Sequence, residues 1–170
     1  MLRSIVALFL FICLTACGFK LRGELPLAPP LHNLYLQTAD PYGELARNLK
    51  LYLKSSGVHL TDTANTASTV FVIQKEETSQ QLLSVGGTQQ TRQYNLILAV
   101  TFEITTPQGV VLVPSQLLSQ SRTIPIQSNQ ILGGSNEANN LYSQMRQSIV
   151  YDIMSRIASQ DVTKLVMKKP

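Results

Sequence analysis

Residues 91–105 read TRQYNLILAVTFEIT, and this stretch decides the fold. Its apolar side chains recur at every second position, which is the period of a β-strand. They are Tyr94, Leu96, Leu98, Val100, Phe102 and Ile104. Because one face is apolar throughout and the other is mixed, the stretch predicts an antiparallel strand with helices on one side.

Two further strands are expected beside it, at residues 69–85 and 110–124. Gly86-Gly87 and Pro107-Gln108-Gly109 carry the residues of hairpin turns, so the three strands should follow one another in antiparallel order. Pro114 has no N–H to donate, which places the third of these strands at an edge or on a bulge.

The segment before these strands predicts a short strand at Leu34–Gln37 and then a helix. Asp40-Pro41 resembles an N-cap followed by proline at the first helical position. The helix should run to about Ser56, and Gly57 is a natural residue to end it.

A long final helix is expected to begin at Ser135 or Asn136 and to run to about Ser159, since its apolar residues are spaced by four. They form a stripe wide enough for burial. The predicted class is α+β: a four-stranded, largely antiparallel sheet with two helices packed on one face, in the order β-α-β-β-β-α.

The N-terminus carries a signal for lipid attachment. Arg3 precedes an apolar run at residues 5–14, which is too short to span a bilayer and has the layout of a signal peptide. Leu14-Thr15-Ala16-Cys17 then resembles a lipobox, so cleavage is expected before Cys17, which would carry the diacylglycerol and N-acyl chains. Gly18 rather than Asp follows, which by similarity to enterobacterial lipoproteins implies the outer membrane.

These signals divide the chain into four parts. Residues 1–16 are the signal peptide and 17–33 the lipidated N-terminus and tether. A single domain covers 34–160, and 161–170 is expected to be a loose C-terminal tail. Cys13 would be removed with the signal peptide, and the Cys17 thiol would be used for lipid attachment. No thiol would then remain for a disulfide, so none is expected.

The chain is poor in charge, with 14% charged residues and a formal net charge of +4, against about 25% charged residues in a typical domain. No basic run indicates nucleic-acid binding. A surface of neutral amides and hydroxyls is either a general periplasmic bias or a face covered by a partner, because such groups are desolvated more cheaply than unpaired charges.

No catalytic or metal-binding constellation stands out. His32 and His59 are the only histidines, and neither has a plausible partner nearby in the sequence. Metal-ligand spacings and a nucleophile elbow are missing. Gly133-Gly134-Ser135 is a weak candidate for an anion site at a helix start, and Glu76-Glu77 is read as a solvated pair. We therefore expect neither an enzyme nor a cofactor other than the lipid.

Four segments resemble the LptE (RlpB) family of LPS-assembly lipoproteins. The opening Cys17-Gly18-Phe19-Lys20-Leu21-Arg22-Gly23 is similar to the start of its mature chains. So are Asp40–Leu45 with the helix exit Ser56-Gly57-Val58, the run Thr91-Arg92-Gln93-Tyr94 into an apolar strand, and Ser135-Asn136-Glu137 before the last helix.

The resemblance implies a non-enzymatic lipoprotein on the periplasmic side of the outer membrane. It would plug an LptD-like barrel as a 1:1 partner and assist insertion of lipopolysaccharide into the outer leaflet. It also implies a four-stranded sheet with two helices. Arg92 and Arg122 are the candidates for binding lipopolysaccharide. The alternative is a generic outer-membrane lipoprotein adaptor for barrel assembly or envelope tethering, and a lipoprotein hydrolase is disfavoured by the lack of a triad.

Overall fold

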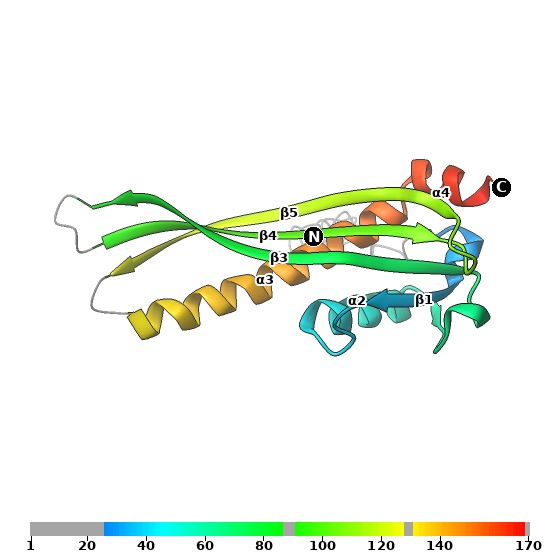
Figure 1. Ribbon diagram of the computed structural model, residues 1–170, viewed down its shortest axis with the longest axis horizontal. Coiled ribbons are helices and arrows are strands. Elements are labelled where there is room, and N and C mark those ends of the chain that lie inside the picture. Colours follow the sequence, from blue (N-terminus) through cyan, green and yellow to red (C-terminus); the bar gives the residue numbers. More distant parts are fainter. Residues whose placement is uncertain (1–25, 87–90, 128–130, 169–170) are drawn as a thin grey trace, which may run out of the picture.

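The computed structural model describes residues 26–86, 91–127 and 131–168, with side chains in the last long helix from residue 136 onward. Within these ranges the chain forms one sheet covered by α-helices (Figure 1). The strands are β1 Asn33–Thr38, β2 His59–Leu60, β3 Thr69–Val85, β4 Thr91–Thr105 and β5 Val111–Gln127. The helices are α2 Glu44–Ser55, α3 Ile131–Ile157 and α4 Gln160–Met167, with short 3-10 turns η1 Pro29–His32 and η2 Ala64–Thr66.

The sheet is mixed, with five strands in the order β2-β1-β3-β4-β5. The hairpins β3–β4 and β4–β5 are antiparallel, as expected, but β1 pairs in parallel with both β2 and β3. The α+β class is therefore confirmed, and the expected four-stranded, largely antiparallel sheet is wrong in detail. The reason is the crossover through α2, which returns the chain in the direction of β1, as parallel pairing requires.

The core lies on the face of β4 that the period-two pattern predicts. The apolar series from Leu96 to Ile104 is fully buried, whereas the residues between them are half-buried. Phe71 of β3 stacks on Phe102, with ring centroids 5.0 Å apart. These rings fix the register where the long hairpin meets the rest of the domain.

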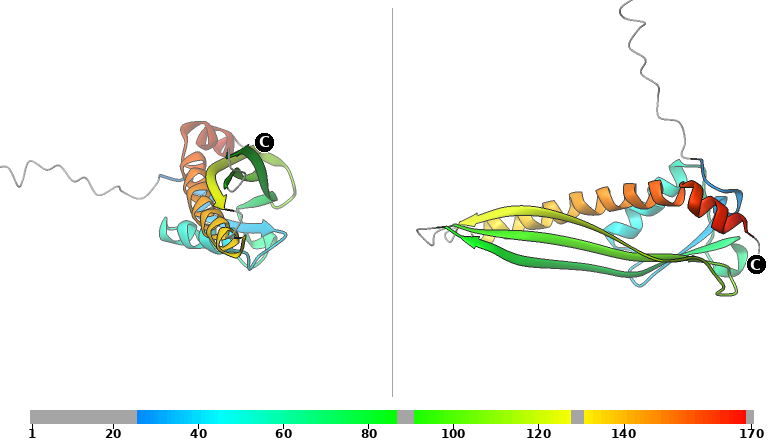
Figure 2. Two further views of the ribbon diagram at one scale, coloured as in Figure 1. Left: turned by 90° about the vertical axis from the view of Figure 1, so that its left-hand side faces the viewer. Right: turned by 90° about the horizontal axis from the view of Figure 1, so that it is seen from above.

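Helix α3 runs along the three long strands, and α2 and α4 lie towards one end of them (Figure 2). Its predicted apolar stripe is confirmed, because Met145, Ile149, Ile153 and Ile157 have no exposed surface. Burial on this scale contributes about 1.5–3 kcal/mol for each large apolar side chain. The helix therefore holds the long strands together along one face.

Both long helices begin elsewhere than expected. The backbone N–H of Tyr42 donates to the Asp40 carboxylate, 3.3 Å apart, so Asp40-Pro41 closes a turn and α2 starts at Glu44 with Gly43 as its N-cap. Helix α3 already starts at Ile131, so Ser135 and Asn136 lie inside it. The helix end at Gly57 is confirmed by its positive φ of 78°.

Residues 161–167, expected to belong to a loose tail, form the additional helix α4 together with Gln160. The Ser159 hydroxyl caps it by accepting from the Val162 N–H at 3.4 Å. Val162 and Val166 are buried in the core cluster. The four-residue spacing of these two valines is the signal that was missed, since it places both on one face of a short helix.

The second predicted turn and the predicted edge position of Pro114 are confirmed by the structure. Gly109 has a φ of 86°, which confirms the turn at Pro107–Gly109. Pro114 lies in β5, the outermost strand next to β4, as its missing donor requires. Gly87 of the first hairpin turn lies outside the described residues.

Candidate partner-binding surface

The face of the long strands that points away from the core carries mostly neutral polar side chains. The register aligns it in cross-strand rows, such as Ser79–Ile97–Ser121 and Gln81–Asn95–Thr123. We call this surface the outer face, and define it by Lys75, Glu77, Ser79 and Gln81 of β3, Asn95, Ile97, Ala99 and Thr101 of β4, and Leu117, Ser119, Ser121 and Thr123 of β5.

Among the residues that define the outer face, charge is confined to one ion pair, and Glu103 is the next outward-facing residue of β4 beyond them. The Lys75 Nζ lies 2.7 Å from Glu77 Oε1, and both side chains are more than half exposed. A pair this exposed is largely neutralised and adds little to stability. Hydroxyl and amide groups therefore dominate the surface, and Leu117 is the most exposed apolar side chain on it.

The opposite face of β3 is tied to the helices through Arg146 of α3. Its Nε lies 2.7 Å from Glu76 Oε1, and its Nη1 lies 3.3 Å from Glu44 Oε2 at the start of α2. Ser143 also donates to the Glu44 carboxylate. Glu76 was expected on a solvated face; the bulge between Ile73 and Lys75 instead turns its side chain towards α3.

Tyr142 provides a second contact between α3 and β3. Its hydroxyl donates to the Ser79 carbonyl oxygen at 2.9 Å. Burial raises the pKa of Tyr142 above 10.0, while the positive charge of Arg146 lowers it. The side chain is half-buried, so it stays a neutral donor at physiological pH.

The two predicted arginines lie near the start of β4 (Arg92) and towards the end of β5 (Arg122). Both are exposed and on the same side of the sheet. Arg92 is paired with Val85 and Ile126, and Arg122 is paired with Leu96, so about 13 Å along the strands separates them. The Arg122 Nη1 donates to the Ser121 carbonyl at 2.9 Å. The structure therefore brings them to one region without direct contact.

Exposed apolar side chains border the arginines, and the sequence reading did not single them out. Leu82, Leu83 and Val85 are about half exposed near the end of β3. Leu82 is paired with Tyr94 and Val85 with Arg92, and Leu83 lies at the register shift between Leu82 and Ser84. Together with Arg92 they make this end, which we call the tip, both apolar and basic.

The other candidate residues bring no chemistry together. Cys17 lies outside the described residues. His32 and His59 are exposed; His32 Nδ1 lies 3.5 Å from the Gly57 carbonyl, and His59 Nδ1 lies 3.4 Å from Asn33 Oδ1. Gly133-Gly134-Ser135 lies within α3, not at its start.

Across the described ranges, no cluster of three or more His, Cys, Asp or Glu side chains could hold a metal ion. None of the helices described is both long enough and apolar enough to cross a membrane.

Known proteins with similar sequences are assembly lipoproteins rather than enzymes. The chain is 32% identical over 93 residues to the LPS-assembly lipoprotein LptE of Yersinia enterocolitica, and the match covers 54% of the chain and 44% of that relative. It is 29% identical over 143 residues to LptE of Yersinia pestis, covering 83% of the chain and 68% of the relative. The chain thus spans less than half of the first relative.

Solved structures share the fold. The rare lipoprotein B of Shewanella oneidensis is 26% identical with a TM-score of 0.66, over 77% of this chain and 97% of that one. A minor lipoprotein of Acinetobacter baumannii is 22% identical with a TM-score of 0.65, over 78% and 93% of the two chains. The second likeness is one of fold alone.

The family itself is given by a sequence profile. The LptE profile, described as lipopolysaccharide-assembly, matches residues 31–157, which run from η1 to the end of α3. The match covers every strand and the two long helices, so the resemblance to the family is confirmed from η1 to the end of α3. The chain belongs to the LptE family of lipopolysaccharide-assembly proteins.

Proposed function

We propose that this protein is a lipid-anchored lipoprotein on the periplasmic side of the outer membrane that binds an LptD-like barrel as a 1:1 plug. In this complex it assists the insertion of lipopolysaccharide into the outer leaflet. Cys17 would carry the anchor, and residues 17–33 would serve as the tether to the single domain at 34–160.

The observation that carries this proposal is the charge-poor, hydrogen-bonding outer face. The interior of a large outer-membrane barrel is polar. A plug must remove its own surface from water against such a wall, and neutral hydroxyl and amide groups lose less free energy on desolvation than unpaired charges do. The hydroxyl groups of Ser79 and Ser121 lie in one cross-strand row, and that of Ser119 lies in the neighbouring row. Each hydroxyl can donate and accept a hydrogen bond.

The dimensions also suit a plug. A strand of 15 residues, the length of β4, spans about 50 Å, whereas the apolar band of an outer-membrane barrel is about 25 Å tall. The elongated domain in Figure 1 can therefore extend through the membrane zone of a barrel and still keep α2 and α4 at one end.

The tip is the proposed contact for lipopolysaccharide, a molecule with anionic groups and acyl chains. Arg92 and Arg122 supply positive charge, and Leu82, Leu83 and Val85 supply apolar surface beside it. On the outer face, by contrast, the basic side chain Lys75 is paired with Glu77. Two regions of the domain would thus have separate roles. The outer face would contact the barrel, and the tip would contact lipopolysaccharide.

Co-purification with the barrel tests the proposal. The full chain, expressed with an LptD-like barrel and extracted in detergent, should elute with it in a stable 1:1 complex. Ser119→Asp combined with Ser121→Asp adds two charges to the outer face and should abolish the complex. The matched control, Ser55→Asp with Ser68→Asp, adds the same charge at exposed positions elsewhere and should leave it intact.

Two results would contradict the proposal. A wild-type chain that purifies without the barrel, or with a different envelope partner, would favour a generic lipoprotein adaptor. Equal complex formation by the outer-face variant and its control would show that the barrel does not contact this face. Circular dichroism of each variant reports whether the fold is kept.

A further inference from the structure

Among the described strands, most of strand β1 has a partner on only one of its two sides. On one side β1 pairs with β3 from Leu34 to Thr38. On the other side β2 pairs only with Asn33 and Leu34, and the Thr61 N–H donates to the Leu34 carbonyl at 3.0 Å as the chain leaves. Within the described residues, no strand lies against Tyr35–Thr38 on this second side.

The backbone groups of this free edge can be assigned by alternation. The Leu34 carbonyl points towards β2, and the Asn33 carbonyl accepts from Ser68 on the β3 side. Successive residues of a strand direct their N–H and C=O groups to opposite sides. Leu36 and Thr38 therefore present their backbone donors and acceptors to the open edge.

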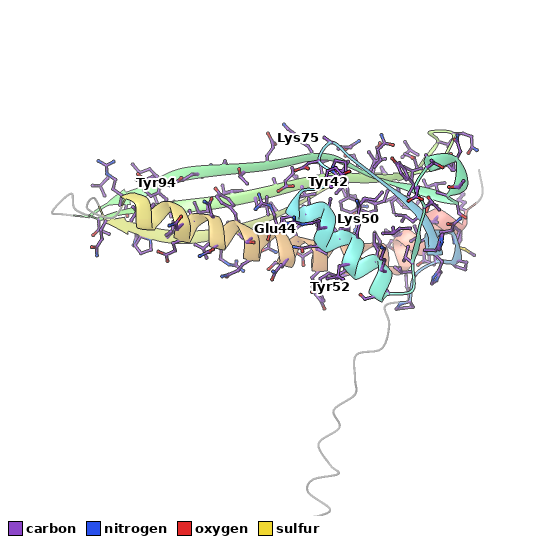
Figure 3. The ribbon with its side chains drawn as sticks, turned by 90° about the horizontal axis from the view of Figure 1, so that it is seen from below. Tyr42, Glu44, Lys50, Tyr52, Lys75 and Tyr94 are labelled. Atoms are coloured by element: carbon purple, nitrogen blue, oxygen red, sulfur yellow. The ribbon has the colours of Figure 1, made fainter. Side chains whose placement is uncertain are left out.

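A groove of about 370 Å³ lies along this edge. Residues 35–38 of β1 line one wall, Lys50 and Lys54 of α2 line the other together with Pro41, and residues 60–62 close one end. Figure 3 shows Lys50 and Glu44 on α2, the helix that packs against α3 and β2.

The charges in the groove favour an acidic occupant. Lys50 and Lys54 face a single carboxylate, Asp62, so the lining carries one net positive charge. The Lys50 Nζ donates to the Pro41 carbonyl at 3.1 Å, which holds the ammonium inside the groove. No ion pair of either lysine with a described residue is formed.

The other long edges of the sheet carry features that discourage an added strand. β5 contains Pro114 and Pro125, and the outer edge of β3 begins with the charged run 75–77. Prolines and charges on edge strands prevent pairing with other chains. The segment Tyr35–Thr38 has neither proline nor charge, which is also true of residues 78–85 of β3, and of the two segments only Tyr35–Thr38 lines the groove.

We propose that this groove binds an extended, acidic peptide segment of a partner protein by strand addition. The segment would continue the line of β2, pair with the backbone of Leu36 and Thr38, and place its carboxylates against Lys50 and Lys54. Main-chain hydrogen bonds give affinity in such complexes and side-chain contacts give selectivity. None of the residues that line the groove belongs to the tip or the outer face, so the site is separate from the proposed barrel and cargo contacts.

Three synthetic peptides test this site on the full chain, isotope-labelled and held in detergent. The first is an eight-residue peptide in which glutamate alternates with valine. In the second, lysine replaces each glutamate. The third keeps the acidic sequence but carries N-methyl groups at alternate backbone amides. The readouts are affinity, from the titration of NMR shifts, and hydrogen exchange at the amides of Leu36 and Thr38.

The acidic peptide should bind and slow exchange at both amides. N-methylation should weaken binding about tenfold, as the loss of two hydrogen bonds implies, and the lysine peptide should not bind. Lys50→Gln with Lys54→Gln should lower affinity for the acidic peptide by a similar factor. The control, Lys164→Gln with Lys168→Gln, removes the same charge from α4 and its C-cap and should change nothing.

Other outcomes overturn the inference. Binding that ignores N-methylation, or that inorganic phosphate abolishes at millimolar concentration without slower exchange at Leu36, would identify a simple anion site. Equal binding of the lysine peptide would remove the role of the two lysines. No binding of the acidic peptide would reject the site, and the proposed barrel partnership would be unaffected.

Discussion

Arg146 of α3 lies with its Nε 2.7 Å from the Glu76 carboxylate of β3, a contact between residues 70 positions apart in the chain. The same guanidinium reaches Glu44 at the start of α2. One side chain therefore links the long strands to both long helices, near the point where β1 ends and β3 stays paired, among the described strands, with β4 only.

Arg146→Ala should lower the free energy of unfolding by about 1–3 kcal/mol. The Arg146 side chain is 23% exposed and its partners are 29% exposed, which lies between surface pairs, worth about 0–1 kcal/mol, and buried pairs, worth about 3–5 kcal/mol when broken. Urea unfolding of the full chain measures the loss. Lys75→Ala is the control, since its ion pair with Glu77 has the same length but is exposed. Equal losses in the two variants would contradict the linking role.

Phe102→Ala should cost about 3–5 kcal/mol and Leu98→Ala about 2–5 kcal/mol, as large-to-small core changes do. Both side chains are fully buried, and Phe102 also loses its stacking on Phe71. Leu117→Ala, on the outer face, should cost under about 1 kcal/mol because its side chain is mostly exposed. Chemical denaturation of the three variants checks the assignment, which fails if the Leu117 change costs as much as the core changes.

Tyr142→Phe should lower stability by about 0.5–1.5 kcal/mol at pH 8, because it removes the hydrogen bond to the Ser79 carbonyl. Burial raises the pKa of Tyr142 in the folded state. The tyrosine therefore contributes stability fully below pH 10, the unfolded value, and loses it as the pH rises through the folded pKa. The stability difference between wild type and variant should shrink above pH 10, as urea midpoints at pH 8 and pH 10.5 will show. A difference that grows with pH would contradict the sign.

Arg92→Glu combined with Arg122→Glu should reduce capture of lipopolysaccharide while leaving the fold intact. Both side chains are exposed, so their electrostatic contribution is screened by salt. Wild-type capture should weaken as ionic strength rises, and the double variant should show a smaller salt dependence. Arg47→Glu, an exposed charge reversal on α2, is the control. Full capture by the double variant would remove these arginines from the binding surface.

Cys17→Ala should block lipid attachment and leave an uncleaved or unanchored protein. The prediction rests on Leu14–Cys17 directly after the apolar run. Mass spectrometry of the mature N-terminus decides it, with a triacylated cysteine expected at the first position in wild type. An unmodified cysteine, or cleavage at another residue, would contradict the proposed anchor.

Local patterns in the sequence were sufficient for much of the fold. The alternation at 91–105 predicted both β4 and its buried face, and the spacing by four along 141–157 predicted the buried stripe of α3. These predictions succeed because a strand or helix with one apolar face has only one way to bury it. The turn glycine at Gly109 follows for a similar reason, since its positive φ strains other residues.

Local reasoning also failed in a consistent way. The cap at Asp40 and the helix start at Ser135 were plausible signals, but helix ends depend on what the preceding chain contacts, and boundaries shift by several residues. Helix α4 was missed because its pattern is only two valines long, and its stability comes from the core cluster that Val162 and Val166 enter.

The proposed functional features also differ in whether sequence or tertiary structure determines them. The lipobox-like motif at Leu14–Cys17 and the low charge of the chain are properties of the sequence itself, because the first is a local motif and the second is composition. The outer face, the tip and the groove beside β1 exist only after folding. They depend on the parallel pairing of β1 with β3 and on the bulge after Ile73, and non-local pairing of this kind is set by the packing of whole elements, which no short stretch of sequence encodes.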